Sequence, residues 1–407
     1  MTVGKNKIIA FASGLFLPVA SFSYVLFHPE KKYFKMLFVM FFAFVGLAFC
    51  VNMEGTSDVS RYVWGFEQLH SIRKVGFLEY FRSIPDKQQI DYYSVFMQWL
   101  ISRITGNPKI YLGILAMVYA MFFAKNVEYI IDKTNNNTKL WVLLIVLLIV
   151  TPKMTSITHR WWTALQVFLY GALPAIFEKK YIRLVWCVIT PLLIHFSFIY
   201  PLIILVAALM LPKRKLFPYL LVFVICSLID SLDFSAITPY IEKIMPEMTA
   251  DRTIGYINAE GDDQNFFATS ARLFMNIANV IISILIFVKG RQSFKADSTM
   301  RSIYVTALMI GSFAAVANLT EWGWRYLNLS NMLLVCLYIY YLSFNVVDAS
   351  VNRMFRVFSP VFIYVIIFQV RGFLSIIGPL QLFAGNYFTT WFLNDSFSVL
   401  EMIKYVL

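Results

Sequence analysis

Three apolar segments follow one another within residues 156–215, and they restrict the possible folds of this chain more than any other feature. Two short basic turns, at 179–180 and at 213–215, separate and close them. A helix that crosses a lipid bilayer needs about 20 mostly apolar residues, and fewer where the bilayer is thin. The pattern therefore predicts helices that cross a membrane up and down.

Composition extends this prediction to the whole chain. Its 407 residues are 59% hydrophobic and 14% charged, whereas a soluble domain carries about 25% charged residues. Lipid leaves only helices or closed barrels, and the alternation that strands would need is absent. We therefore predict an all-α, polytopic integral membrane protein with about twelve transmembrane helices. The predicted spans are 8–27, 35–51, 110–128, 139–151, 160–177, 181–194, 196–211, 216–231, 270–288, 302–318, 326–344 and 358–376.

The basic residues predict the orientation. The formal net charge is +12, which could suggest nucleic acid, but lysine and arginine gather in short turns between the apolar runs. Inner loops of membrane proteins carry this excess, so the N-terminus is expected outside and no nucleic-acid partner is expected. The sequence shows no nucleoside-triphosphate loop, no dinucleotide fingerprint and no clustered metal ligands. Neither a metal nor a cofactor is therefore expected.

Two longer segments are expected on the outer side. The first, 52–109, contains an amphipathic stretch, 91–105, in which four polar residues recur at helical spacing on one face: Asp91, Ser94, Gln98 and Ser102. This stretch is short, so it is predicted to lie in the outer interface plane rather than to cross. The second outer loop runs over 231–270. With these insertions, the whole chain, 1–407, is expected to form a single transmembrane domain.

This topology brings ionisable residues from distant segments to one face. Arg160 heads the span 160–177, and His195 stands between the next two spans. Charges on a lipid-embedded bundle are costly, so a function is the first explanation to consider. Arginine binds phosphate oxygens in a planar, bidentate way, and several arginines around one cavity suit a diphosphate that carries a lipid tail. The residues expected on this face include Asp58, Arg61, His159, Arg160, His195, Arg252, Glu321 and Arg325.

Each of these residues also has an ordinary explanation. Arg160 and Arg325, at span ends, could extend to phospholipid headgroups. His195 could be a packed side chain that is bonded to a carbonyl, and Asp58 could cap a helix over 59–70. Glu321 could simply pair with Arg325 four residues later. Tryptophans near the span ends are typical of an aromatic belt at the membrane surface: Trp161, Trp162, Trp322 and Trp324.

Five short motifs, taken in order, resemble those of a known family. They are Gly55-Thr-Ser-Asp58-Val-Ser-Arg61-Tyr62, Arg160-Trp-Trp-Thr-Ala164 followed by Lys179-Lys180, Ile194-His195-Phe196-Ser197, Arg252-Thr-Ile-Gly-Tyr256, and Arg325-Tyr326. The likeness is to the EpsG/Wzy-like family of bacterial polysaccharide polymerases, which make O-antigen, capsule and exopolysaccharide. Two departures stand out: Trp161 occupies a position that is usually glutamine, and Ser57 is an extra residue before Asp58.

The resemblance implies a GT-C-like glycosyltransferase in the bacterial inner membrane, with its active site facing outside. The donor would be a repeat unit on undecaprenyl diphosphate, and the carrier diphosphate would leave when the units are joined. By this likeness, a chain-length regulator and a flippase are expected partners, beside membrane lipids. The implied diphosphate ligands are Arg160, Arg325, Arg252 and Arg61. The implied base is Asp58 or His195, with Glu321 as a third candidate, and the implied further substrate contacts are Tyr62, His159 and Tyr256.

Two other functions remain open at this stage. An O-antigen ligase would use the same donor with a lipopolysaccharide acceptor, and one sequence barely separates it from a polymerase. A flippase or exporter of the lipid-linked glycan would carry charges along the midplane of many helices and would show internal repeats. Here the spans are largely uncharged at mid-depth, which favours the enzyme.

Overall fold

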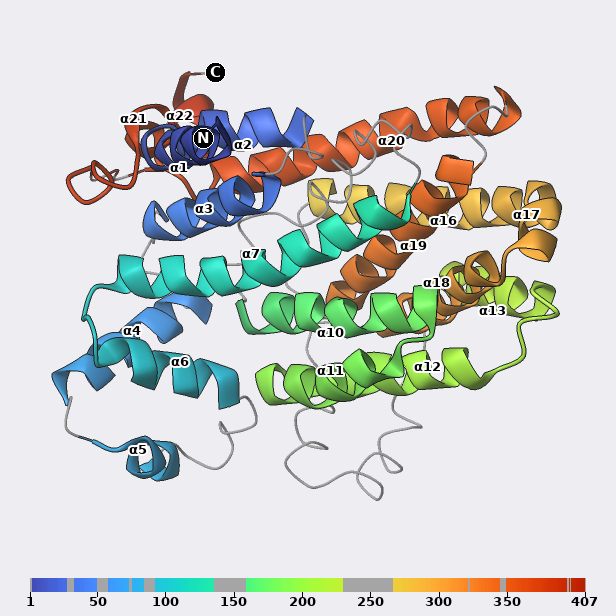
Figure 1. The fold of residues 1–407 in the computed structure, drawn as a ribbon, viewed down its shortest axis with the longest axis horizontal. Helices are drawn as coiled ribbons and strands as arrows, with labels where there is room; N and C mark the ends of the chain where they lie inside the picture. The colour runs from blue at the N-terminus through green and yellow to red at the C-terminus, as the bar shows by residue number, and fades with distance from the viewer. Residues whose placement is uncertain are drawn as a thin grey trace. The chain divides into compact units, whose positions relative to one another are not determined.

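The computed structural model is helical throughout its regular secondary structure, apart from one isolated antiparallel bridge between Phe49 and Ile377, in the part of the chain that it describes (Figure 1). The expected all-α class is confirmed. The predicted span 139–151 and nearly all of the outer loop 231–270 lie outside the described residues. The structure describes residues 2–27, 33–49, 58–72, 75–83, 92–134, 159–229, 266–320, 323–344, 349–393, 395 and 397–406.

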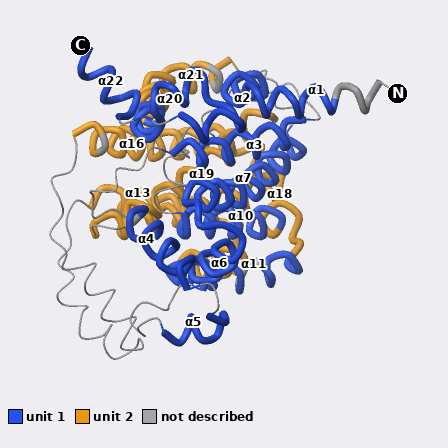
Figure 2. Tube along the Cα trace, turned by 90° about the vertical axis from the view of Figure 1, so that its left-hand side faces the viewer, with its two compact units in different colours: residues 1–174, 181–199, 369–407 blue, residues 175–180, 200–368 orange. Residues whose placement is uncertain are grey.

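The chain divides into two compact units (Figure 2). The first comprises 1–174, 181–199 and 369–407, and the second comprises 175–180 and 200–368. This division does not test whether the chain forms the single transmembrane domain expected from the sequence, which stays a prediction.

The first unit is built on the packing of α3 (Phe34–Leu47) against α7 (Pro108–Lys133). Two glycines permit the approach: a Cβ atom placed on Gly46 would lie 2.7 Å from the Cα atom of Gly113. Small residues at such crossings are typical of helices that pack in membranes. Further along the same two helices, aromatic rings pack between them, with Phe38 edge-on to Phe123 at 5.2 Å between centroids.

The predicted span 8–27 is wrong as a single helix. The structure has α1 (Thr2–Phe16) of 15 residues and α2 (Pro18–Phe27) of 10 residues. Proline has no backbone N–H to donate and is well tolerated only in the first turn of a helix, so Pro18 begins a new helix. Neither piece alone has the length of an ordinary span.

The described residues between α3 and α7 include three short helices: α4 (Asp58–Ser71), α5 (Phe77–Ser83) and α6 (Tyr92–Ser102). The helix predicted over 91–105 is thus present as α6. Its polar side chains, Ser94, Gln98 and Ser102, are buried, and its exposed face carries Tyr92, Phe96 and Leu100. Gln98 donates from Nε2 to the Tyr62 carbonyl at 3.1 Å, so the polar stripe of α6 is used to hold α4.

The rest of the first unit contains α10, α11 and the C-terminal residues. Helix α10 (His159–Glu178) belongs to this unit as far as Pro174, and α11 (Tyr181–Ile194) leads into a 3-10 turn, η2 (Phe196–Phe198). Two short C-terminal helices, α21 (Pro379–Ala384) and α22 (Val399–Val406), complete it.

The second unit is a bundle with a polar seam. Its core is α18 (Ser298–Ala317) packed on α19 (Trp324–Phe344). Asn279 donates to Asn331 Oδ1 at 2.7 Å and accepts from Tyr338 Oη at 2.9 Å, so buried amide groups are paired between helices. The other helices of the unit are α12 (Ile199–Met210) from Tyr200 on, α13 (Phe217–Leu228), α16 (Phe266–Lys289), α17 (Arg291–Ala296) and α20 (Ala349–Leu374) as far as Phe368.

Five of the described helices are long and apolar enough to cross a membrane. Five further apolar helices are shorter, with 10–17 residues. The chain therefore has the helices of a membrane protein, while the total of about twelve spans and the orientation stay predictions. The five long segments are Pro108–Lys133, Thr269–Lys289, Ser298–Ala317, Trp324–Ser343 and Phe355–Leu374.

Candidate functional site

The N-terminal end of α10 lies inside a group of aromatic side chains in the first unit. His159, the first residue of α10, is fully buried, with 0% of its surface exposed. Three tyrosine rings surround its imidazole, at centroid distances of 4.7 Å for Tyr62, 6.2 Å for Tyr93 and 6.3 Å for Tyr111. These rings come from α4, α6 and α7, and we call the three together the tyrosine cage. The cage joins the segment 58–102 to the start of α10.

Arg160 follows His159 and lies on the same cage. Its Cζ atom is 5.0 Å from the ring centroid of Tyr62, a cation–π contact, and the side chain is half-buried. Tyr62 thus contacts the guanidinium and the imidazole of two consecutive residues. The charge of Arg160 also acts on the buried hydroxyl of Tyr111.

Two buried polar atoms at the centre of the cage, Nδ1 and Nε2 of His159, have no hydrogen-bond partner within the described part of the chain. Folded proteins leave few such atoms unpaired, and each one requires an explanation, such as a catalytic or ligand-binding role. The unpaired imidazole nitrogens therefore mark the cage as a candidate site.

The imidazole of His159, which precedes the predicted span 160–177, is neutral at ordinary pH. Burial, and to a smaller extent the nearby Arg160 charge, lower the pKa of His159 to about 3. A neutral imidazole has one nitrogen that donates and one that accepts. His159 can therefore both give and receive a hydrogen bond to a substrate group, without adding charge to the site.

His195 lies at the turn between α11 and η2. Its Nδ1 atom is 2.8 Å from Ser197 Oγ and accepts from the Ser197 backbone N–H at 3.4 Å. The Phe198 ring of this turn packs against α10, 5.5 Å from the Trp161 ring and 5.8 Å from the Phe168 ring. The turn that carries His195 therefore packs beside the first turns of α10, the helix that carries Arg160.

The remaining predicted residues fall into three groups. Asp58 is the first residue of α4, one turn before Tyr62, and Arg61 is exposed on the same helix. Arg325 belongs to the second unit, in the first turn of α19. Arg252, Tyr256 and Glu321 lie outside the described residues.

In the second unit, two arginines gather on one tryptophan. The Cζ atom of Arg272 is 5.0 Å from the Trp324 ring centroid, and that of Arg325 is 6.0 Å from it. Arg272 comes from α16 and Arg325 from α19, so the unit carries a pair of guanidinium groups at one ring. This pairing gives the second unit its own candidate anion contact.

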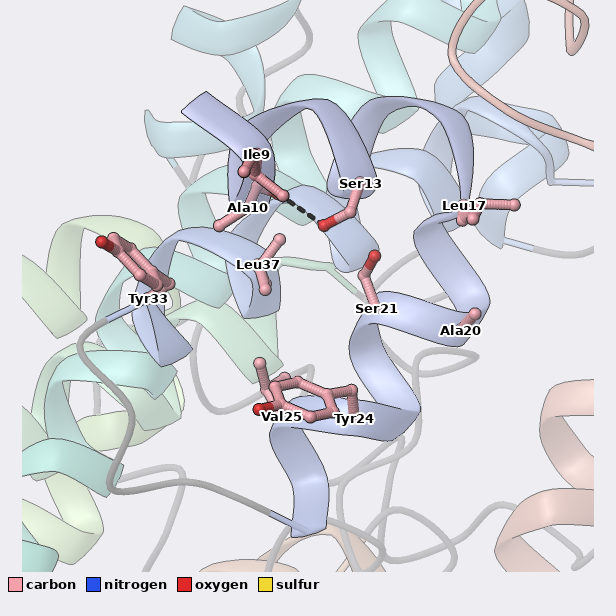
Figure 3. Close-up of a pocket in the computed structure, with 10 residues that line it drawn as sticks. All are labelled: Ile9, Ala10, Ser13, Leu17, Ala20, Ser21, Tyr24, Val25, Tyr33 and Leu37. Atoms are coloured by element: carbon pink, nitrogen blue, oxygen red, sulfur yellow. Dashed lines mark hydrogen bonds between the residues drawn. The ribbon is translucent and has the colours of Figure 1, made fainter. Parts of the chain in front are cut away.

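A hollow of about 470 Å³ lies between α1, α2 and α3 in the first unit (Figure 3). Its walls include Leu17, Val25 and Leu37, and Ser13 turns its hydroxyl to the carbonyl of Ala10 at 2.8 Å. Among the described residues that line it, none carries a charged side chain and none belongs to the predicted site.

Metal ligands do not cluster in the described parts of the chain, where no group of three or more His, Cys, Asp or Glu side chains could hold an ion. What the structure offers instead is guanidinium charge, a neutral imidazole and tyrosine hydroxyls. These groups bind anions and hydroxylated ligands.

The described residues are helical, and several of their helices are long and apolar enough to cross a bilayer, so the fold defines a helical membrane protein. The model of the EpsG family matches residues 31–380, and the chain belongs to that family. This establishes the resemblance that the sequence motifs indicated. No curated protein and no solved structure gave a match.

Proposed function

We propose that this chain is a polysaccharide polymerase that joins glycan repeat units carried on undecaprenyl diphosphate. Membership of the EpsG family supports the polymerase class. The observation that carries the finer proposal is the position of Arg160, half-buried on Tyr62 and next to the buried, neutral His159. A cation held in that way suits a diphosphate at the membrane surface.

The reaction is a displacement at the anomeric carbon of the donor. A hydroxyl oxygen of the acceptor unit bonds to that carbon, and the bond from the carbon to the diphosphate oxygen breaks. The electron pair leaves with the carrier diphosphate, and the hydroxyl proton goes to a base. Arg160 stabilises the charge that grows on the leaving group, and partial burial strengthens this effect because the local dielectric is lower than that of water.

The base is Asp58 or His195, and the choice stays open, with Glu321 as a third candidate. Asp58 begins α4 one turn before Tyr62, so its backbone lies close to the cage. His195 already shares a hydrogen bond with Ser197, which orients its ring. Whichever residue acts as the base must lie within hydrogen-bond reach of the acceptor hydroxyl, so its position decides whether it can take the proton.

Arg325, Arg252 and Arg61 are the further proposed diphosphate ligands, and Tyr62, His159 and Tyr256 the further substrate contacts. We place the reaction at the outer face of the bacterial inner membrane. A flippase would supply the donor there, and a chain-length regulator would limit the product.

The test is to incubate the purified protein with a lipid-diphosphate-linked repeat unit and to resolve the products on a gel. A ladder of products is expected from the wild-type chain and not from Arg160→Ala. Transfer of a single unit to added lipopolysaccharide, without a ladder, would indicate a ligase. Transport of the lipid-linked unit across vesicles, with no product, would indicate an exporter.

A further inference from the structure

The first unit carries a cluster of two cations around the ring of Tyr170, which lies further along α10 than Arg160. Lys125 of α7 places its Nζ atom 5.2 Å from the Tyr170 ring centroid. Arg183 of α11 places its Cζ atom 5.6 Å from the same centroid. Phe122 closes one side, with its ring 5.7 Å from that of Tyr170 and 5.7 Å from Lys125 Nζ. Helices α7 and α11 thus each place one cation at the same ring of α10.

Neither cation is neutralised by an ion pair within the described part of the chain. The carboxylate nearest in sequence to Lys125, Glu128, pairs instead with Lys35 at 3.5 Å. Glu178, near Arg183 in sequence, pairs with Lys180. Two like charges on one ring repel each other, and an anion between them would remove that repulsion. Within the described residues, no carboxylate therefore pairs with Lys125 or Arg183, and a bound anion would offset their two positive charges.

Position along the helices indicates where that anion comes from. Helix α7, with 26 residues, is longer than the roughly 20 residues that cross the hydrocarbon core, so its last turns extend toward the headgroups. Lys125 lies in the last third of α7, and Arg183 lies in the first turn of α11, just after the turn at 179–180. Both side chains are long enough to place their charge at the level of lipid phosphates.

We propose that Lys125, Arg183 and Tyr170 form a binding site for the headgroup phosphate of an anionic phospholipid. The guanidinium provides a bidentate contact, the ammonium a point charge, and the Tyr170 hydroxyl a further donor. The two aromatic rings hold the cations in place when the lipid is absent. This site is separate from the reaction proposed above and does not depend on it.

The experiment is native mass spectrometry of the full chain released from nanodiscs that contain equal parts of phosphatidylglycerol and phosphatidylcholine. The wild-type chain is expected to retain phosphatidylglycerol selectively. The double variant Lys125→Gln, Arg183→Gln should retain on the order of tenfold less. The matched control, Arg214→Gln with Lys215→Gln, removes the same charges from an exposed turn and should retain as much as wild type.

Two further arms keep the result decisive. The charge-preserving pair Lys125→Arg, Arg183→Lys should keep the lipid, which separates loss of binding from loss of folding. Equal retention by the double variant and the control, or equal retention of phosphatidylcholine, would overturn the proposal. Release of the bound lipid by millimolar inorganic phosphate would assign the site to a soluble anion and would also overturn it.

Discussion

The guanidinium of Arg160 lies over the ring of Tyr62, with Cζ 5.0 Å from the centroid, and that same ring contacts the buried imidazole of His159. Tyr62 belongs to α4, a short helix outside the predicted spans, and Arg160 is the second residue of α10. The Tyr62 ring of α4 therefore holds in place the guanidinium of Arg160, which belongs to α10. If Arg160 binds the donor diphosphate, Tyr62 sets where the charge stands before the donor arrives.

Tyr62→Leu is expected to lower the rate of polymer formation by roughly twofold to thirtyfold. The leucine removes the cation–π contact, which contributes about 0.5–2 kcal/mol. Tyr62→Phe keeps the ring and should keep most of the rate. Initial rates with a lipid-linked repeat unit provide the measurement, and Tyr181→Leu, an exposed tyrosine of α11, is the control. Equal rates for Tyr62→Phe and Tyr62→Leu would show that the ring does not position Arg160.

Arg160→Ala and Arg325→Ala are each expected to reduce polymer formation by about 10²–10³-fold. Each removes a donor that would stabilise charge on the leaving diphosphate, and such losses are typically of this size. The comparison is Arg353→Ala, an exposed arginine of α20 that takes no part in the proposed site. Wild-type rates in both variants, from protein that elutes as a single species, would exclude these arginines as diphosphate ligands.

The long apolar segments were predictable because hydropathy depends on composition over about 20 residues. Helices α7, α16, α18 and α19 accordingly appear where the apolar runs lie. The rotation of a helix is harder to predict, since it depends on what packs against it. Trp161 and Trp162 show this: both match an aromatic belt in sequence, yet each is only 1% exposed, in the interior of the first unit.

The site was predictable only in part, and for a similar reason. Arg160 and His195 stand at the ends of apolar runs, where a charge or imidazole is conspicuous. Tyr93 and Tyr111 were missed, because tyrosine is common in a chain with 17% aromatic residues and nothing near them in sequence singles them out. Only their shared contact with His159 in three dimensions identifies them.

His159 is expected to make the folded chain less stable in acid. Its pKa in the folded chain is about 3, below the ordinary value of 6.5, so the unfolded chain binds the proton first as the pH falls below about 6.5. Stability is therefore lost between about pH 6.5 and pH 3, and the loss at pH 5 is about 2 kcal/mol. His159→Phe, which cannot be protonated, should flatten this part of the profile. Thermal unfolding in detergent from pH 7.5 to 4.5 provides the measurement, and identical slopes for the two proteins would contradict the assignment.

Gly46→Ala is expected to destabilise the first unit by about 1–3 kcal/mol. Its new Cβ atom would lie 2.6 Å from the Leu112 carbonyl oxygen and 2.7 Å from the Gly113 Cα atom. Both contacts are backbone, so a rotamer change cannot relieve them, and α3 must move away from α7, as in other overpacked cores. Gly76→Ala is the matched control, because a Cβ atom there meets nothing within 4 Å. The unfolding midpoint in detergent should fall for Gly46→Ala and stay near wild type for Gly76→Ala. If the two variants unfolded alike, the close crossing of α3 and α7 would not be the contact that holds the first unit together.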